Sequence, residues 1–176
     1  MYTKLLDGEI EDTDLEQLRE LLAVLDSHFA QYTEKRNQAA PPEQNVYWDR
    51  LSYVAGLGFV MCQQYINDTW RSAGLDFKTA MAIPPLYETE LSVVRVINAA
   101  ANYWKHYVED VDFPKGTLRE ETMKVIQQLN QDIESGCLME VFLEHLVGLQ
   151  DQPFAKLSDL LVQWRGQVIA TANREI

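Results

Sequence analysis

Leucine and aromatic residues recur at alternating steps of three and four over residues 15–32, and this spacing constrains the fold more than any other feature of the chain. Such steps return to one side of an α-helix, whereas a half-buried strand would alternate apolar and polar residues. Acidic residues precede the run, and Lys35 and Arg36 follow it, as the helix dipole favours. The pattern predicts a long amphipathic helix with the buried stripe Leu15, Leu18, Leu22, Leu25, Phe29 and Tyr32.

Two capping-box motifs mark predicted helix starts. Residues 13–16 and 117–120 each place a threonine three residues before a glutamate, and both side chains can bond amides that a helix end leaves unpaired. We therefore expect helices to begin at Thr13 and Thr117. The second should stop at Ser135-Gly136 and bury Leu118, Val125, Leu129 and Ile133.

Proline and glycine positions predict the other helices. One should run from about Asn45 to Ser72, and another from Pro84-Pro85 to about Glu109. A short helix over 138–149 and a last helix after Pro153 complete the set, and an apolar linker is expected around Met81–Ile83. The last helix should bury Leu157, Leu160, Leu161, Trp164 and Val168.

Two glycines lie in the middle of the predicted second helix. Gly56 and Gly58 each cost about 1 kcal/mol relative to alanine at an interior helix position. Close approach of another helix would offset that cost, so we expect a tight packing contact at this point.

No segment shows sustained alternation with β-branched residues, and no helix pair repeats at a fixed period. The chain is therefore predicted to be all-α, an antiparallel bundle of about six helices. Its 176 residues suit a single domain, 1–176, with a short flexible N-terminus of about residues 1–11.

The charge balance excludes some partners. Fifteen Lys and Arg against twenty-seven Asp and Glu give a net charge of -12, which repels nucleic acid and anionic lipid. A protein partner, in particular a basic one, is the expected kind of partner. No apolar run is long enough for a signal or a membrane span, so we expect a cytoplasmic protein without membrane contact.

Motifs for common enzyme chemistries are missing from the sequence. It has no glycine-rich phosphate loop, Cys-x-x-Cys, His-Glu-x-x-His or Gly-x-Ser-x-Gly. A di-metal bundle site would need Glu-x-x-His, but Leu25, Tyr103 and Phe142 stand where those glutamates would be. We expect no metal and no cofactor.

One predicted helix, residues 84–109, carries a polar row that is a candidate binding surface. Its members recur at steps of three or four and so fall within about 80° of arc, opposite an apolar arc. Two asparagines in the row lower helix propensity, which favours specific hydrogen-bonding roles. The row could also be only the solvated face of the helix. The predicted binding residues are Arg95, Asn98, Asn102, His106 and Glu109.

The stretch Ala101–His106 resembles the signature region of HEPN domains, helical bundles of bacterial toxin–antitoxin and phage-defence systems. The family motif is arginine, a polar residue that is often asparagine, three variable residues, and histidine. Asn102 and His106 match it, whereas Ala101 stands at the arginine position. In active members the arginine and histidine are taken to serve RNA cleavage, so the resemblance implies a non-catalytic or divergent member.

These observations favour a binding protein over an enzyme. The leading hypothesis is a small acidic interaction protein of a bacterial or phage conflict system, immunity- or antitoxin-like, which binds a basic protein and could form a homodimer. One alternative is a divergent HEPN-type ribonuclease that uses His106 and Asn102 as catalytic residues. The other is a helical scaffold or adaptor.

Overall fold

The computed structural model describes residues 2–4, 10–87, 91–107, 117–129 and 138–174 of the chain. Within these ranges the predicted all-α bundle is confirmed, with seven helices in place of the expected six. The helices are α1 (Thr13–Gln38), α2 (Pro41–Ser72), α3 (Phe77–Ala82), α4 (Val93–Tyr107), α5 (Thr117–Leu129), α6 (Leu138–Val147) and α7 (Pro153–Ala172).

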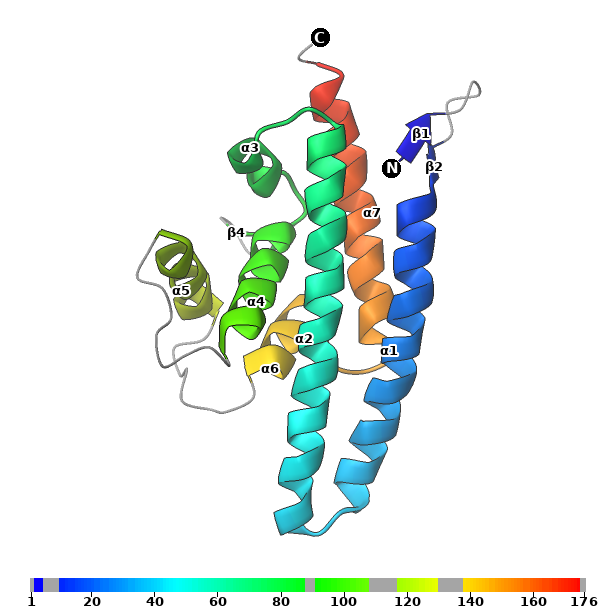
Figure 1. The fold of residues 1–176 in the computed structure, drawn as a ribbon, viewed down its shortest axis with the longest axis vertical. Coiled ribbons are helices and arrows are strands. Elements are labelled where there is room, and N and C mark those ends of the chain that lie inside the picture. The colour runs from blue at the N-terminus through cyan, green and yellow to red at the C-terminus, as the bar shows by residue number, and fades with distance from the viewer. Residues whose placement is uncertain (1, 5–9, 88–90, 108–116, 130–137, 175–176) are drawn as a thin grey trace.

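Three long helices set the length of the molecule (Figure 1). α1 and α2 form an antiparallel hairpin whose tip extends past the other helices, and α7 packs against both. α4 and α5 lie on the other side of α2, and α3 lies beside the end of α2. This arrangement leaves α2 at the centre, in contact with α1, α4, α6 and α7.

The predicted apolar stripes form the core. The stripe of α1 is buried from Leu15 to Phe29, and Tyr32 packs against the core at its edge. Four of the five stripe residues of α7 are buried, and Leu160 is partly exposed. Trp164 is fully buried and donates its indole N–H to the Ala80 carbonyl at 3.1 Å, which ties α7 to α3.

The cap of α1 differs from the prediction. The side chain that bonds the first turn belongs to Asp12, and not to Thr13, because the Asp12 carboxylate accepts from Leu15 N at 3.0 Å. The same carboxylate accepts from the Tyr65 hydroxyl at 2.6 Å and from Arg165 at 2.7 Å. Asp12 therefore joins α1, α2 and α7 as well as capping a helix.

Proline has different effects at the two predicted boundaries. α2 begins at Pro41, before the expected Asn45, because the first turn of a helix leaves its N–H groups unpaired and tolerates proline. α4 begins at Val93, well after the predicted Pro84-Pro85. Ile83, which precedes the prolines, is extended, and a hairpin of β3 (Leu86–Tyr87) and β4 (Leu91–Ser92) follows them.

Further differences are local. The predicted linker around Met81–Ile83 is largely the short helix α3, capped by Asp76, whose carboxylate accepts from Thr79 N at 3.0 Å. Near the N-terminus, β1 (Tyr2–Lys4) pairs antiparallel with β2 (Ile10–Asp12), within the segment expected to be flexible. The prediction of no sheet is thus wrong at these two hairpins. The side chains of residues 117–119, and residues 133, 135 and 136, lie outside the described ones.

Both mid-helix glycines of α2 lie under an aromatic ring. A Cβ on Gly56 would come within 2.0 Å of the Trp104 indole of α4, and one on Gly58 within 2.4 Å of the Phe154 ring of α7. The expected close packing contact is therefore present, although side chains, and not helix backbones, make the approach.

Gly58→Ala should destabilise the fold by about 1–3 kcal/mol, because the fully buried Phe154 ring would have to move and overpacking outweighs the gain in helix propensity. The matched control is Gly166→Ala on α7, where nothing lies within 4 Å. That variant should stabilise by about 0.5–1 kcal/mol. Urea unfolding of both variants tests the pair, and equal effects would contradict the packing role of Gly58.

Candidate functional site

The polar row of α4 lines a pocket that α2, α3 and α5 complete. Its volume is about 780 Å³, within the range of roughly 300–1,000 Å³ that small-molecule sites show. The polar lining residues are Gln63, Asn67, Lys78, Arg95, Asn98, Asn102, Lys105, Glu121 and Thr122, and the apolar ones are Phe77, Met81, Ala82, Ala99 and Val125.

Ser92 fixes where α4 begins and so where the row faces. Its hydroxyl donates to the Met81 carbonyl of α3 and accepts from Arg95 N at 3.3 Å, which caps the first turn. Ser92 is buried, and the β3–β4 hairpin brings it into place. The start of α4 is therefore anchored to α3 on the wall of the pocket.

A buried amide network lies at the contact between α2 and α4. Gln63 Nε2 donates to Asn98 Oδ1 at 2.7 Å and to Asn102 Oδ1 at 2.9 Å. Lys105 Nζ donates to Gln63 Oε1 at 2.7 Å. Gln63 and Asn102 are 6% and 8% exposed, so this network replaces water for both.

The lysine determines the orientation of all three amides. Lys105 has donors and no acceptor, so the Gln63 atom that faces it must be the oxygen. The Gln63 NH₂ group then faces the two asparagines, which must present their oxygens to it. The NH₂ groups of Asn98 and Asn102 are consequently left to donate elsewhere. A row that looks symmetrical in sequence thus becomes a set of hydrogen-bond donors.

The charge of the pocket is opposite to that of the chain. Among its described lining residues, Lys78, Arg95 and Lys105 face a single acid, Glu121. That carboxylate pairs with Arg95 at 3.4 Å and with Lys124 at 2.9 Å. Partial burial lowers the pKa of Lys105, since desolvation disfavours its charge. An anion would therefore find unneutralised cations here, although the chain carries a net charge of -12.

Three of the five predicted binding residues meet in this pocket. Arg95, Asn98 and Asn102 line it together, whereas His106 is partly buried and does not line it. Glu109 lies outside the described residues. The predicted apolar arc of α4 is buried from Val93 to Ala101. Asn98 and Asn102 thus contact α2 through Gln63, whereas Arg95 pairs with Glu121 of α5 and its side chain is 37% exposed. The interpretation of a merely solvated face does not fit the two asparagines.

The binding residues predicted from the sequence include neither Gln63 nor Lys105, although both belong to the network. A signal for Gln63 was available, because Phe59 and Ile66 are its neighbours on the helix surface and both are buried core residues. A polar amide at such a position needs a partner. The identity of that partner depends on which helix packs there, and this the sequence does not show.

Comparisons with known proteins assign no family. No family model, curated protein or solved structure matches the chain. In the described ranges no helix is both long and apolar enough to cross a membrane. The same residues contain no group of three or more His, Cys, Asp or Glu side chains placed to hold a metal ion.

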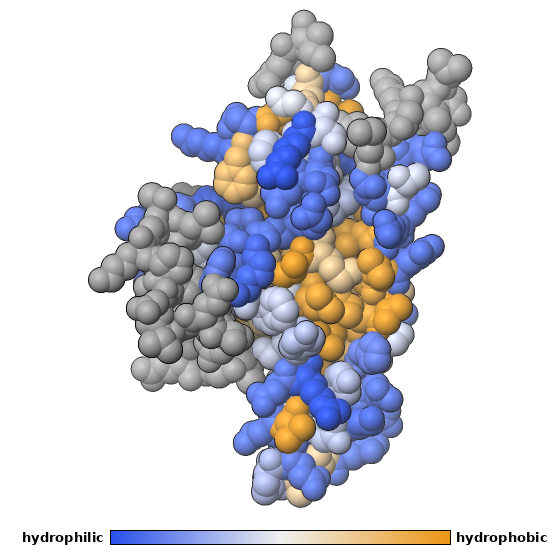
Figure 2. All heavy atoms as spheres, viewed as in Figure 1, coloured by the Kyte–Doolittle hydropathy of each residue, from blue (hydrophilic) through white to orange (hydrophobic). Residues whose placement is uncertain are grey.

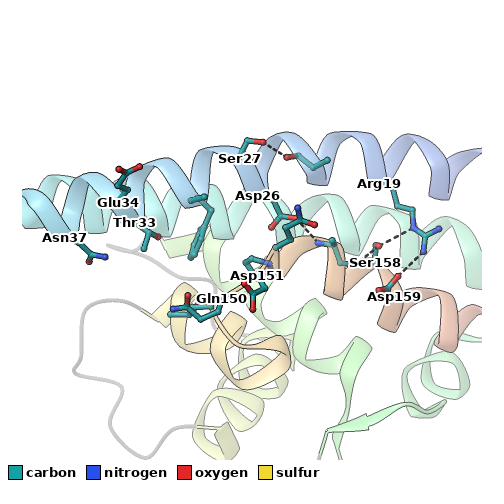
Figure 3. Close-up of a pocket in the computed structure, with 17 residues that line it drawn as sticks. Arg19, Asp26, Ser27, Thr33, Glu34, Asn37, Gln150, Asp151, Ser158 and Asp159 are labelled. Carbon is teal, nitrogen blue, oxygen red and sulfur yellow. Dashed lines mark hydrogen bonds and ion pairs between the residues drawn. The ribbon is translucent and has the colours of Figure 1, made fainter.

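A second hollow, of about 890 Å³, lies between α1 and the start of α7 (Figure 3). Asp26 of α1 points across it to the first turn of α7, where its carboxylate accepts from Phe154 N and Ala155 N, both at 2.9 Å. Arg19 pairs with Asp159 at 3.0 Å at one end. Asp26, Arg19 and Asp159 thus join two helices, which favours a structural role for this hollow.

Proposed function

We propose that this chain is a non-catalytic binding protein and that its pocket between α2, α4 and α5 holds the anionic end of a ligand. The observation that carries the proposal is the Gln63 network, which turns the amide NH₂ groups of Asn98 and Asn102 away from α2. Lys105 and Arg95 add cationic donors to the same wall. A site lined by donors suits a group that only accepts, such as a phosphate or a carboxylate.

The geometry favours binding over cleavage. Asn102 Oδ1 is engaged by Gln63, and His106 does not line the pocket, so the two candidate catalytic residues do not meet at one open site. Ala101, at the arginine position of the HEPN motif, is fully buried in the core. A cation at that position would point into apolar surroundings and away from any phosphate. These facts support the binding hypothesis over the ribonuclease alternative.

The biological system and the protein partner of this chain stay predictions from the sequence. A role in a conflict system rests on the HEPN resemblance, and a basic protein partner rests on the net charge of -12. The proposed pocket is compatible with both, because a small anionic ligand and a basic protein would use oppositely charged parts of the surface.

Titration with inorganic phosphate, acetate and a nucleoside monophosphate, followed by amide chemical shifts, tests the pocket. We expect saturable shifts at Asn98, Asn102 and Lys105. Lys105→Ala should weaken binding by roughly tenfold to a hundredfold, since a charged donor contributes about 1.5–3 kcal/mol. Preference among the three probes then distinguishes a phosphate from a carboxylate site.

Two neighbouring residues supply matched controls. Lys124→Ala removes a cation of α5 that does not line the pocket, and it should leave the affinity within about twofold. Gln63→Leu should weaken binding because the asparagines lose their fixed orientation, whereas Gln64→Leu, one residue along α2 and exposed, should not. Equal effects of the two glutamine variants would contradict the proposal.

A further inference from the structure

An apolar surface covers the outer side of the α1–α2 hairpin (Figure 2). Leu21 and Val24 of α1 are 48% and 54% exposed, and Tyr53 of α2 is 62% exposed. Leu57, Val60 and Met61 of α2 are partly buried and pack against the core from the same helix as Tyr53. We call these six residues the outer hairpin face. At one edge of the face the Tyr53 ring packs against the Trp104 ring of α4, with centroids 5.5 Å apart, and the apolar surface between α1 and α2 faces solvent (Figure 2).

The face is separate from the buried stripe of α1. At about 100° per residue, Leu21 and Val24 lie on the flank of α1 beyond Leu18 and Leu25, away from α7. Leu21 and Val24 are apolar although they are exposed and do not belong to the buried stripe of α1. Contiguous exposed apolar surface of this kind is typical of protein contacts, whereas scattered single residues are not.

Charge is distributed unevenly along the same surface. The end near the start of α1 and the end of α2 carries Asp14 and Asp68. The end near the hairpin tip carries Lys35 and Arg50, with one acid, Glu43, two turns before Arg50 on the same side of α2. The apolar centre is therefore flanked by an acidic end and a basic end, and the surface is complementary to itself when one copy is reversed end to end.

We propose that a second copy of this chain covers the outer hairpin face, with α1 antiparallel to α1 and α2 antiparallel to α2 of the partner. The two-fold axis passes between the hairpins near Val24 and Leu57. Each acidic end then meets the basic end of the other copy. The interface of this dimer then consists of four helices in two layers, one hairpin from each copy.

The positions of the charged residues along each helix agree with this axis. Arg50 and Asp68 lie symmetrically about residue 59, and Asp14 and Lys35 lie symmetrically about a point beside Val24. The two centres are nearly level, because Arg50 lies over the Tyr32 ring at 5.5 Å and so fixes how α1 and α2 align. From Asp14 to Lys35 the surface is roughly 30 Å long. Over two helices of about 10 Å width, that gives an area of the order of a standard interface, about 800 Å² per partner.

This inference does not depend on the ligand pocket. The outer hairpin face and the pocket share no residue, and Gln63 and Asn67 are the only described residues of α2 that line the pocket. Loss of dimerisation and loss of anion binding are therefore separable by experiment.

Analytical ultracentrifugation over a wide concentration range tests the dimer. We expect wild-type protein to be a dimer at micromolar concentrations. Val24→Glu places two carboxylates near the axis and should raise the dissociation constant by about a hundredfold or more. Leu21→Glu should act in the same direction, and circular dichroism shows that each variant is folded.

Two further comparisons sharpen the test. Leu86→Glu changes an apolar residue of similar exposure, 48%, on β3, and should leave the dimer unchanged. Arg50→Glu should weaken the dimer by about fivefold, and Arg50→Glu combined with Asp68→Arg should restore it, because the charges then match again. A wild-type protein that stays monomeric at its highest soluble concentration, or a Val24→Glu variant that dimerises like wild type, would overturn the proposal.

Discussion

Replacing Asp12 by alanine should lower the free energy of unfolding by about 3–5 kcal/mol, which is the cost of removing one partner of a buried ion pair. Asp12 and Arg165 are 4% and 12% exposed, and their atoms lie 2.7 Å apart. Without the carboxylate, the guanidinium stays buried and uncompensated, since Arg165 Nε already lacks a hydrogen-bond partner. The helix cap at Leu15 and the bond from Tyr65 are lost in the same change.

Urea unfolding gives the free energy of unfolding of Asp12→Ala, and Asp159→Ala is the control variant. Asp159 also pairs with an arginine, Arg19, but both side chains are exposed, at 67% and 48%. An exposed pair contributes about 0–1 kcal/mol, so the control should unfold almost like wild type. If the two variants lost similar stability, the cluster around Asp12 would not be what joins α1, α2 and α7.

Acidification should weaken the same cluster around Asp12 and lower the free energy of unfolding. Burial by itself would raise the pKa of Asp12, but hydrogen bonds from Tyr65, Arg165 and Leu15 N outweigh it and lower the pKa below 3.8. The stability from this lowered pKa is present above about pH 4 and is lost as the pH falls through the folded-state pKa. Asp12→Ala should therefore lose less stability than wild type on acidification below pH 4.

The contribution of Glu140 to stability should change with pH in the opposite direction, and near neutral pH. This residue is 3% exposed on α6, neither carboxylate oxygen has a hydrogen-bond partner, and burial raises its pKa to about 7. Because the folded state favours the protonated form, the contribution is full below pH 4.5 and is lost as the pH rises through 7. A shift of this size corresponds to about 3 kcal/mol.

Unfolding free energies of wild type and Glu140→Gln between pH 5 and pH 8 test this prediction. Wild type should lose stability over that range, and the variant should lose about 3 kcal/mol less, because its amide does not titrate. Glu144→Gln, one turn along α6 and exposed, removes the same formal charge and should keep the wild-type slope. Parallel slopes for all three proteins would show that Glu140 is not a buried titrating group.

Helix periodicity predicted most of the fold from the sequence. The stripe from Leu15 to Phe29 and the stripe of α7 are buried as predicted, because a 3.6-residue repeat places such residues on one side wherever the helix packs. Gly56 and Gly58 likewise predicted close contacts. Boundaries that depend on local competition were less predictable, and Asp12, Pro41 and Val93 mark where the actual caps and starts differ.

The sequence did not predict which helices pack against each other or which side chains form hydrogen bonds between them. The row Arg95, Asn98 and Asn102 was predictable as one side of a helix. Its chemistry depends on Gln63, which lies 35 residues before Asn98 in the chain. Only the packing of α2 against α4 brings that amide to the asparagines and orients their NH₂ groups. The contact of Asp12 with Arg165 and the burial of Glu140 likewise depend on how the helices pack. Periodicity is local and is therefore readable in sequence, whereas hydrogen bonds between helices depend on the rotation and offset of each helix, which the whole core decides together.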